Sequence, residues 1–281
     1  MCQILLIILL SIFPLLSVNF KYSAGANWNE IIFSELYEIV QGAEYKKGLT
    51  EVNAPFNSGP WFQIGLEQKL SDRFFFTAEY ELGYEWKGNV YFDSSMQENP
   101  FSVIDTIAGS LSARFVVLSF NFGTEIFSYE NFKLLGSLGY IHDEVTRYVD
   151  VYLRNEIFRF YSWYNAPVIA LNAQTKIDKF TSNIKFAFSA SHLNLIFDKY
   201  PSNNQILYYW PYVTGWKIAA NWDYEINECN HTGLDLSWIV QKNVSDGCVK
   251  LPSNETRFRN NSAPFVRSQL WLVTAYWNHE F

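Results

Sequence analysis

Histidine and carboxylate side chains are the groups in this chain that could act as general bases or bind a metal ion. The chain has four histidines, and one of them begins the run His142-Asp143-Glu144. This run could supply a base or a metal site. Neighbouring residues of a β-strand point to opposite sides, so the three side chains cannot converge on one ion within a strand. We interpret the run as the solvated entrance to a loop.

The rest of the sequence contains few further groups that could catalyse a reaction or bind a cofactor. His192 precedes Asp198, and we interpret it as a rim residue without a partner. The sequence contains no phosphate-binding loop, no dinucleotide fingerprint, no zinc-type spacing of cysteine and histidine and no Gly-x-Ser-x-Gly elbow. We therefore expect no cofactor and no bound metal.

The elements that would position these residues are β-strands, because apolar and polar residues alternate with a period of two. From Phe74 to Tyr84 every second residue is apolar, while Thr77, Glu79 and Glu81 occupy the opposite row. The segments 61–70, 180–190 and 216–226 alternate in the same way. Alternation indicates an all-β fold, but it does not distinguish a soluble sandwich from a membrane barrel.

The connections between the strands alternate in length along the chain. Four are short and polar, at 71–73, 128–131, 177–179 and 227–232. Five are longer, at 45–59, 85–105, 142–155, 193–205 and 241–264. Membrane barrels have tight turns at the periplasmic rim and long loops at the extracellular rim. The pattern predicts a ten-stranded antiparallel transmembrane β-barrel with both termini on the periplasmic side.

The composition agrees with a barrel that spans an outer membrane. No run after the N-terminus reaches the roughly 20 apolar residues of a membrane helix. Aromatic residues near the strand ends are expected to form interfacial girdles, and they are Trp61, Tyr84, Tyr129, Trp163, Trp216 and Trp277. The net charge is −7 and there is no basic block, so a nucleic-acid partner is not expected.

Polar rows would line the lumen of such a barrel. Ten strands leave a narrow lumen that side chains fill, so no wide pore is expected. We expect lumen-facing acids to form ion pairs with basic residues inside the barrel. The acids are Glu79, Glu81, Asp223 and Glu225, and the expected partners are Lys185, Lys217 or Arg159.

The N-terminus is typical of a secretion signal. An apolar run extends from Ile4 to Val18, and the small residues Ala24-Gly25-Ala26 follow it. We expect cleavage after Ala26, so that 1–26 is a signal peptide and 27–281 is the outer-membrane barrel.

Cys229 and Cys248 lie at opposite ends of one predicted strand. A disulfide needs Cα atoms within about 7 Å of each other, and a full strand is much longer than that. Both residues are expected to be free thiols.

A series of local runs appears in a defined order along the chain. They are the first strand 35–42 with the charged stretch 44–47, then Phe56-Asn57, Leu82-Gly83, Gly88-Asn89, Asp93-Ser94-Ser95 and 166–171. This order resembles the omptins, ten-stranded outer-membrane endopeptidases with an active site between extracellular loops. For an active member, the resemblance implies an Asp–His pair facing an Asp–Asp pair across a groove, with a water as nucleophile.

The catalytic positions implied by this resemblance are only partly matched. Where the family has Asp-x-His, this chain has Asp198-Lys199-Tyr200, so a tyrosine replaces the base. Tyrosine ordinarily has a pKa of about 10 and is a poor base at neutral pH. Where the family has Asp-x-Asp before an Asp-Ser-Ser run, only Asp93 is present. The resemblance therefore implies a degenerate site at Asp93, Asp198 and Tyr200.

We expect an omptin-like surface barrel whose protease site is degenerate and whose long loops bind or adhere to partners. One alternative is an active endopeptidase with a rearranged site that uses Asp93, Asp198 and either His192 or His142. Another is a small transport or structural barrel. The implied partners are outer-membrane lipid, with lipopolysaccharide as a candidate, and an extracellular peptide or protein. The implied location is the bacterial outer membrane.

Overall fold

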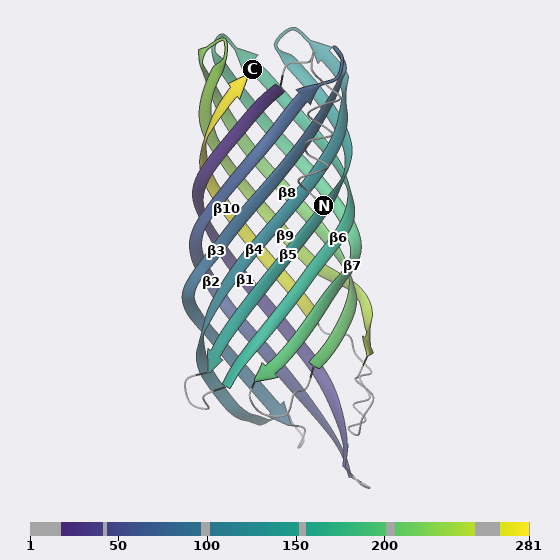
Figure 1. The fold of residues 1–281 in the computed structure, drawn as a ribbon. Helices are drawn as coiled ribbons and strands as arrows, with labels where there is room; N and C mark the ends of the chain where they lie inside the picture. The colour runs from purple at the N-terminus through teal and green to yellow at the C-terminus, as the bar shows by residue number, and fades with distance from the viewer. Residues whose placement is uncertain are drawn as a thin grey trace, which may run out of the picture.

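The computed structural model describes residues 18–41, 44–96, 102–151, 156–200, 206–250 and 265–280, which form a closed antiparallel barrel of ten strands (Figure 1). Consecutive strands pair with each other, and β1 also pairs with β10, which closes the sheet. No helix long and apolar enough to cross a membrane occurs in the described residues. The predicted fold class is confirmed. The strands are β1 (Val18–Gln41), β2 (Glu44–Lys69), β3 (Phe74–Met96), β4 (Ser102–Tyr129), β5 (Phe132–Val151), β6 (Glu156–Ile177), β7 (Phe180–Tyr200), β8 (Ile206–Asn227), β9 (Asn230–Lys250) and β10 (Phe265–Glu280).

Short turns join the strands at one end of the barrel, at 70–73, 130–131, 178–179 and 228–229. They coincide with the short connections expected from the sequence. Ser71 Oγ accepts hydrogen bonds from the backbone N–H groups of Arg73 (3.3 Å) and Phe74 (3.2 Å). Glu130 and Asp178 adopt left-handed conformations, with φ of 48° and 51°, which are unfavourable for residues with a Cβ. Short turns face the periplasm in membrane barrels, and we refer to this end as the short-turn end. It is drawn at the top of Figure 1. We call the half of the barrel at the short-turn end the lower half and the opposite one the upper half.

Apolar side chains cover the outer wall upward from the short-turn end. On β3 the outward row runs from Phe74 through Tyr80 to Tyr84, which are 45%, 42% and 38% exposed. Tyr84 lies ten residues beyond Phe74. In a strand tilted by about 40° these residues span a height of about 25 Å. That height matches the apolar band of an outer-membrane barrel.

The expected girdle residues lie on the outward rows, with one exception. The outward members are Tyr84, Tyr129, Trp163, Trp216 and Trp277. Trp61 instead points into the lumen and is 1% exposed, because it shares a row with Gln63 and not with the outward Phe62. The girdle assignment of Trp61 is therefore wrong, and the residue has an internal role that is described below.

The strands continue well beyond the apolar band, and they include most of the expected long loops. β2 is a strand of 26 residues that contains the whole segment 45–59. Parts of the other four segments, namely 85–96, 102–105, 142–151, 193–200 and 241–250, also belong to strands. The expected loop boundaries are therefore wrong, and the rest of these segments lies outside the described residues. All strands but β10 have 20 to 28 residues, which gives the barrel a height of about 50–70 Å at the same tilt, so its upper half stands above the band.

The first strand begins inside the predicted signal peptide. Residues 19–26 pair with both β10 and β2, and Lys21 forms an ion pair of 2.9 Å with Asp235. Residues 1–17 lie outside the described residues. Cleavage after Ala26 stays a prediction, and it would remove a segment that is paired on both sides.

The two C-terminal cysteines are far apart. Cys229 is free and exposed in the last short turn, whereas Cys248 lies near the other end of β9. The extended chain between them covers about 60 Å, so they cannot form a disulfide with each other. This part of the sequence-based prediction is confirmed.

Candidate functional site

The three candidate residues from the sequence lie on two strands in the upper half of the barrel. Asp93 is on β3, where it pairs with Thr106 of β4. Asp198 and Tyr200 are on β7, where Asp198 pairs with Arg159 of β6. Strands β4, β5 and β6 separate β3 from β7, and ten strands close at a diameter of about 20 Å. The backbone places Asp93 almost across the barrel from the other two residues, and their catalytic role stays a prediction.

Two histidines belong to the upper half, and both lie on the outer wall. His142 Nδ1 lies 2.7 Å from Asn165 Oδ1, and its Nε2 lies 4.0 Å from Glu144 Oε2. The intervening Asp143 points into the lumen, which confirms that the run His142-Asp143-Glu144 does not converge. The run lies within β5 and not at a loop entrance. His192 is exposed, and its ring packs edge-on against Tyr212 with centroids 5.3 Å apart, so the expectation that it lacks a partner is wrong.

The other two histidines lie near the short-turn end. His231 Nδ1 is 2.9 Å from Asp223 Oδ2, and His279 Nδ1 is 2.9 Å from Asn230 Oδ1. All four histidines of the chain are thus accounted for. In the part of the chain that the structure describes, no three histidine, cysteine or carboxylate side chains gather as a metal site requires.

The lower half of the lumen is filled by polar side chains that bond to one another. Lys21 Nζ donates a hydrogen bond to Asp235 Oδ2 at 2.9 Å and lies 4.2 Å from the centre of the Tyr276 ring. The Tyr276 hydroxyl donates to Asp223 Oδ1 at 2.9 Å. Charged groups inside a barrel need such partners because an unpaired buried charge is costly. We call this region the polar layer.

An ion pair spans the lumen at the top of the polar layer. Lys217 Nζ lies 3.8 Å from Glu81 Oε1, and Trp61 Nε1 donates to Glu81 Oε2 at 2.9 Å. Lys217 is on β8 and Glu81 is on β3, which are five strands apart in either direction around the barrel. Since these strands lie on opposite walls, the pair crosses the full width of the lumen. It confirms the ion pair expected between Glu81 and Lys217.

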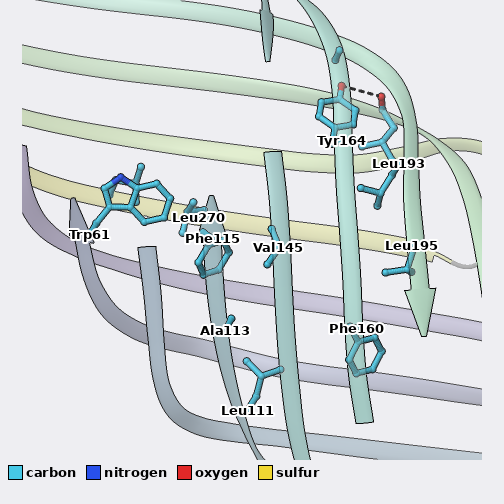
Figure 2. Packing of buried hydrophobic residues seen from close by; sticks show 13 residues of the cluster. Trp61, Leu111, Ala113, Phe115, Val145, Phe160, Tyr164, Leu193, Leu195 and Leu270 are labelled. Carbon is cyan, nitrogen blue, oxygen red and sulfur yellow. Dashed lines mark hydrogen bonds between the residues drawn. The ribbon is translucent and has the colours of Figure 1, made fainter. Parts of the chain in front are cut away.

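Apolar side chains line most of the lumen above the polar layer (Figure 2). The Trp61 and Phe115 rings are 5.8 Å apart and inclined by 48°. The Tyr164 hydroxyl lies 3.1 Å from Ser189 Oγ and 3.5 Å from the Val213 carbonyl oxygen. A cavity of about 130 Å³ remains, lined both by this cluster and by residues of the polar layer. The buried cluster consists of Trp61, Leu111, Ala113, Phe115, Val145, Phe160, Tyr164, Ala166, Leu193, Leu195, Val213, Leu270 and Leu272.

A second bridge crosses the lumen beside this cavity. Gln241 Nε2 of β9 donates to Asp143 Oδ2 of β5 at 3.0 Å, and these strands are four apart around the barrel. Arg147 lies on the same inward row as Asp143, is 5% exposed, and holds its guanidinium 5.7 Å from the centre of the Phe115 ring. Asp143 Oδ1 and Arg147 Nε are buried without a hydrogen-bond partner in the described residues. Asp143 is visible in the sequence only as part of the run His142-Asp143-Glu144, and no motif marks Arg147 or Gln241.

Other ion pairs differ from the expectation. Asp223 pairs with His231 at 2.9 Å, and Glu225 pairs with Lys176 at 3.0 Å in an exposed position near a turn. Arg159 is exposed on the outer wall, where its guanidinium lies 5.7 Å from the Tyr148 ring centre. Arg159 is therefore not a lumen partner.

Comparisons with known proteins support the barrel architecture. No protein-family model matches the chain, and no curated protein matches it. Among solved structures, the outer membrane protease OmpT from Escherichia coli aligns over 94% of this chain and 97% of its own, with a TM-score of 0.76 and 11% identity. The likeness is one of fold. The outer membrane protein OprG from Pseudomonas aeruginosa aligns over 94% of this chain and 95% of its own, with a TM-score of 0.35 and 12% identity.

Proposed function

We propose that this chain is an outer-membrane surface barrel that binds partners at its extracellular end and does not hydrolyse peptides. The positions of the four histidines carry this proposal. Hydrolysis of the omptin kind would need an imidazole base beside a carboxylate at the extracellular opening. His142 and His192 contact outer-wall residues instead, and His231 and His279 lie near the short-turn end.

The lumen bridges argue against a transport function. The ion pair of Glu81 with Lys217 and the hydrogen bond of Asp143 with Gln241 each join distant walls. A solute crossing the barrel would have to displace both. The upper half of the barrel supports a binding role, because strands that rise about 35 Å above the apolar band present a large surface outside the membrane.

Outer-leaflet lipid is a second proposed partner. Arg114, Arg159, Lys242 and Arg267 are exposed on the outer wall above the apolar band. Arginine and lysine at this height can pair with the phosphate groups of lipopolysaccharide. The aromatic girdles and these basic residues together support a location in the outer membrane.

The proposal is tested by peptide cleavage with the refolded barrel in detergent and lipopolysaccharide. A substrate with paired basic residues is used, OmpT serves as the positive control, and heat-modifiable gel migration shows that the barrel is folded. We expect no cleavage above the buffer rate. Cleavage that Asp198→Ala abolishes and that the turn substitution Asp72→Ala leaves unchanged would overturn the proposal in favour of a rearranged active site.

A planar-bilayer measurement tests the absence of transport. We expect no steady single-channel current from the folded wild-type barrel, because two bridges cross its lumen. A stable conductance in wild type that scales with salt concentration would show a continuous water-filled path and would favour a transport barrel.

A further inference from the structure

The cavity above the polar layer has the form of a small-molecule site. Its volume is about 130 Å³, close to the roughly 150 Å³ of an apolar cavity that binds benzene. Aromatic and aliphatic side chains make up most of its wall, including Trp61, Phe115, Tyr164, Leu193 and Leu270. A wall of this kind favours an apolar ring over water.

The position of the Trp61 ring shapes one side of the cavity. A Cβ on Gly83 would lie 2.1 Å from Trp61 Cε3, so the absence of a side chain at Gly83 lets the indole lie against β3. The indole is held at its other end by the hydrogen bond to Glu81. The aromatic wall is therefore preorganised, which lowers the entropic cost of binding.

Polar groups at the cavity divide into satisfied and unsatisfied sets. In the polar layer, Glu81 is partnered by Lys217 and Trp61. Asp143 Oδ1 and Arg147 Nε, by contrast, have no hydrogen-bond partner among the described residues, although both side chains line the cavity. A bound molecule with a donor would satisfy Asp143, and one with an acceptor would satisfy Arg147.

We infer that this cavity binds a small neutral aromatic molecule that carries one hydroxyl group. The ring would occupy the space between Trp61, Phe115 and Leu193, and the hydroxyl would donate a hydrogen bond to Asp143 with its oxygen facing Arg147. A hydroxyl suits the polar side of the cavity formed by Asp143 and Arg147, because it both donates and accepts hydrogen bonds. Three acids and three bases line the cavity, namely Glu79, Glu81, Asp143, Arg147, Lys185 and Lys217. The wall therefore has no excess of either sign, and a neutral ligand is favoured over an aromatic carboxylate, whose burial without a dedicated counter-charge is costly.

The experiment is ¹⁹F NMR of 4-fluorophenol with the folded barrel in lipid nanodiscs. We expect a bound resonance that is distinct from the lipid-partitioned signal and saturates at about one ligand per barrel. Ala187→Phe, which adds a ring to the cavity wall, removes this resonance. The matched control Ala275→Phe adds the same ring to the outer wall and leaves the resonance unchanged.

A second comparison tests the polar edge. Fluorobenzene should also give a bound resonance, and 4-fluorobenzoate should give none. Asp143→Leu should weaken 4-fluorophenol binding about tenfold, because it removes a hydrogen bond to a charged group, and should leave fluorobenzene binding within about twofold. If Asp143→Leu weakened the binding of 4-fluorophenol and fluorobenzene equally, the placement of the hydroxyl beside Asp143 would be overturned.

Other outcomes bear on the site as a whole. No saturable resonance from a barrel with heat-modifiable migration, or a resonance that persists in Ala187→Phe, would overturn the cavity site. If Ala187→Phe fails to fold, Leu193→Phe fills the same cavity and takes its place. Peptide hydrolysis plays no part in this experiment, so a failure here is distinct from a failure of the proposed non-hydrolytic function.

Discussion

The ion pair that crosses the lumen is expected to contribute substantially to the stability of the barrel. Lys217 and Glu81 are 3.8 Å apart, and their side chains are 25% and 6% exposed. Replacing Lys217 with Met leaves the Glu81 carboxylate inside the lumen, where the Trp61 indole is its remaining hydrogen-bond donor within the described part of the chain. We predict that Lys217→Met lowers the free energy of unfolding by about 3 kcal/mol.

The magnitude follows from the burial of the acid. Removing one partner of a buried ion pair costs about 3–5 kcal/mol, because the remaining charge is uncompensated. We expect the loss of unfolding free energy to lie at the lower end of this range, because Lys217 is partly exposed and the Trp61 indole still donates a hydrogen bond to Glu81. Removing both charges, as in Glu81→Gln with Lys217→Met, is expected to recover most of the loss, since no buried charge then lacks a partner.

The assay is urea unfolding of the barrel in detergent, followed by tryptophan fluorescence. With an m-value of about 3 kcal/mol per molar urea, the midpoint of Lys217→Met should fall by about 1 M. If refolding and unfolding curves do not coincide, unfolding rates are compared instead. Each variant must first show heat-modifiable migration.

A surface ion pair provides the control. Lys176 and Glu225 are closer, at 3.0 Å, but their side chains are 53% and 24% exposed. Lys176→Met should therefore shift the urea midpoint much less than Lys217→Met does, because exposed ion pairs contribute little to stability. If the two lysine substitutions have equal effects, the lumen is solvated like the surface, and the reasoning from burial is refuted.

Three further predictions rest on single contacts. Gly83→Ala should lower the free energy of unfolding by about 1–3 kcal/mol, because its Cβ would meet the Trp61 ring at 2.1 Å. The control is Gly65→Ala, whose Cβ would come no nearer than 3.4 Å to another atom. It should lower the free energy of unfolding clearly less in the same urea assay. Glu130→Gly should raise the urea midpoint by the equivalent of about 1 kcal/mol, since Glu130 has a φ of 48°; an unchanged or lower midpoint would contradict the strain at this turn. Because residues 19–26 pair with both neighbouring strands, the structure favours cleavage before Lys21 over the sequence-based site after Ala26. Intact mass should therefore show that the mature chain retains Lys21, which pairs with Asp235 at 2.9 Å; a folded barrel that begins at Asn27 would support the sequence-based site and contradict this.

The alternation of residues was sufficient to predict the lower half of the barrel. Where lipid faces the outer wall, the outward row must be apolar and the inward row must be polar, so a period of two appears in the sequence. The segment from Phe74 to Tyr84 is therefore recognisable as a strand, and its alternation, with that of the segment 216–226, places Glu81 and Lys217 in the lumen. The short turns were also recognisable, because polar residues interrupt the apolar rows there.

The upper half could not be read in the same way. In β4 the inward residues Phe115 and Val117 alternate with the outward residues Val116 and Leu118, so both rows are apolar and the period disappears. Toward the upper end, hydrogen bonding to the neighbouring strands determines where a strand ends. The periodicity of residues along one segment does not show which residues of the neighbouring strand it pairs with. The bond between Asp143 and Gln241 joins residues 98 positions apart, and alternation gives only their rows and not their partnership.

The polarity of the inward and outward side chains reverses near the upper edge of the apolar band. On β3, below this edge, Glu79 and Glu81 face the lumen while Tyr80 faces outward. On β4, above it, Phe115 and Ala113 are buried in the lumen while Arg114 is exposed outside. Lipid requires the first arrangement, and water on the outer wall permits the second, in which the lumen becomes an ordinary hydrophobic core. The cavity lies where these two arrangements meet, since Glu81 and Lys217 of the polar layer and Phe115 and Leu270 of the apolar cluster all line it. A cavity with an apolar wall and a polar side is therefore expected at this level in a barrel that is taller than the apolar band around it.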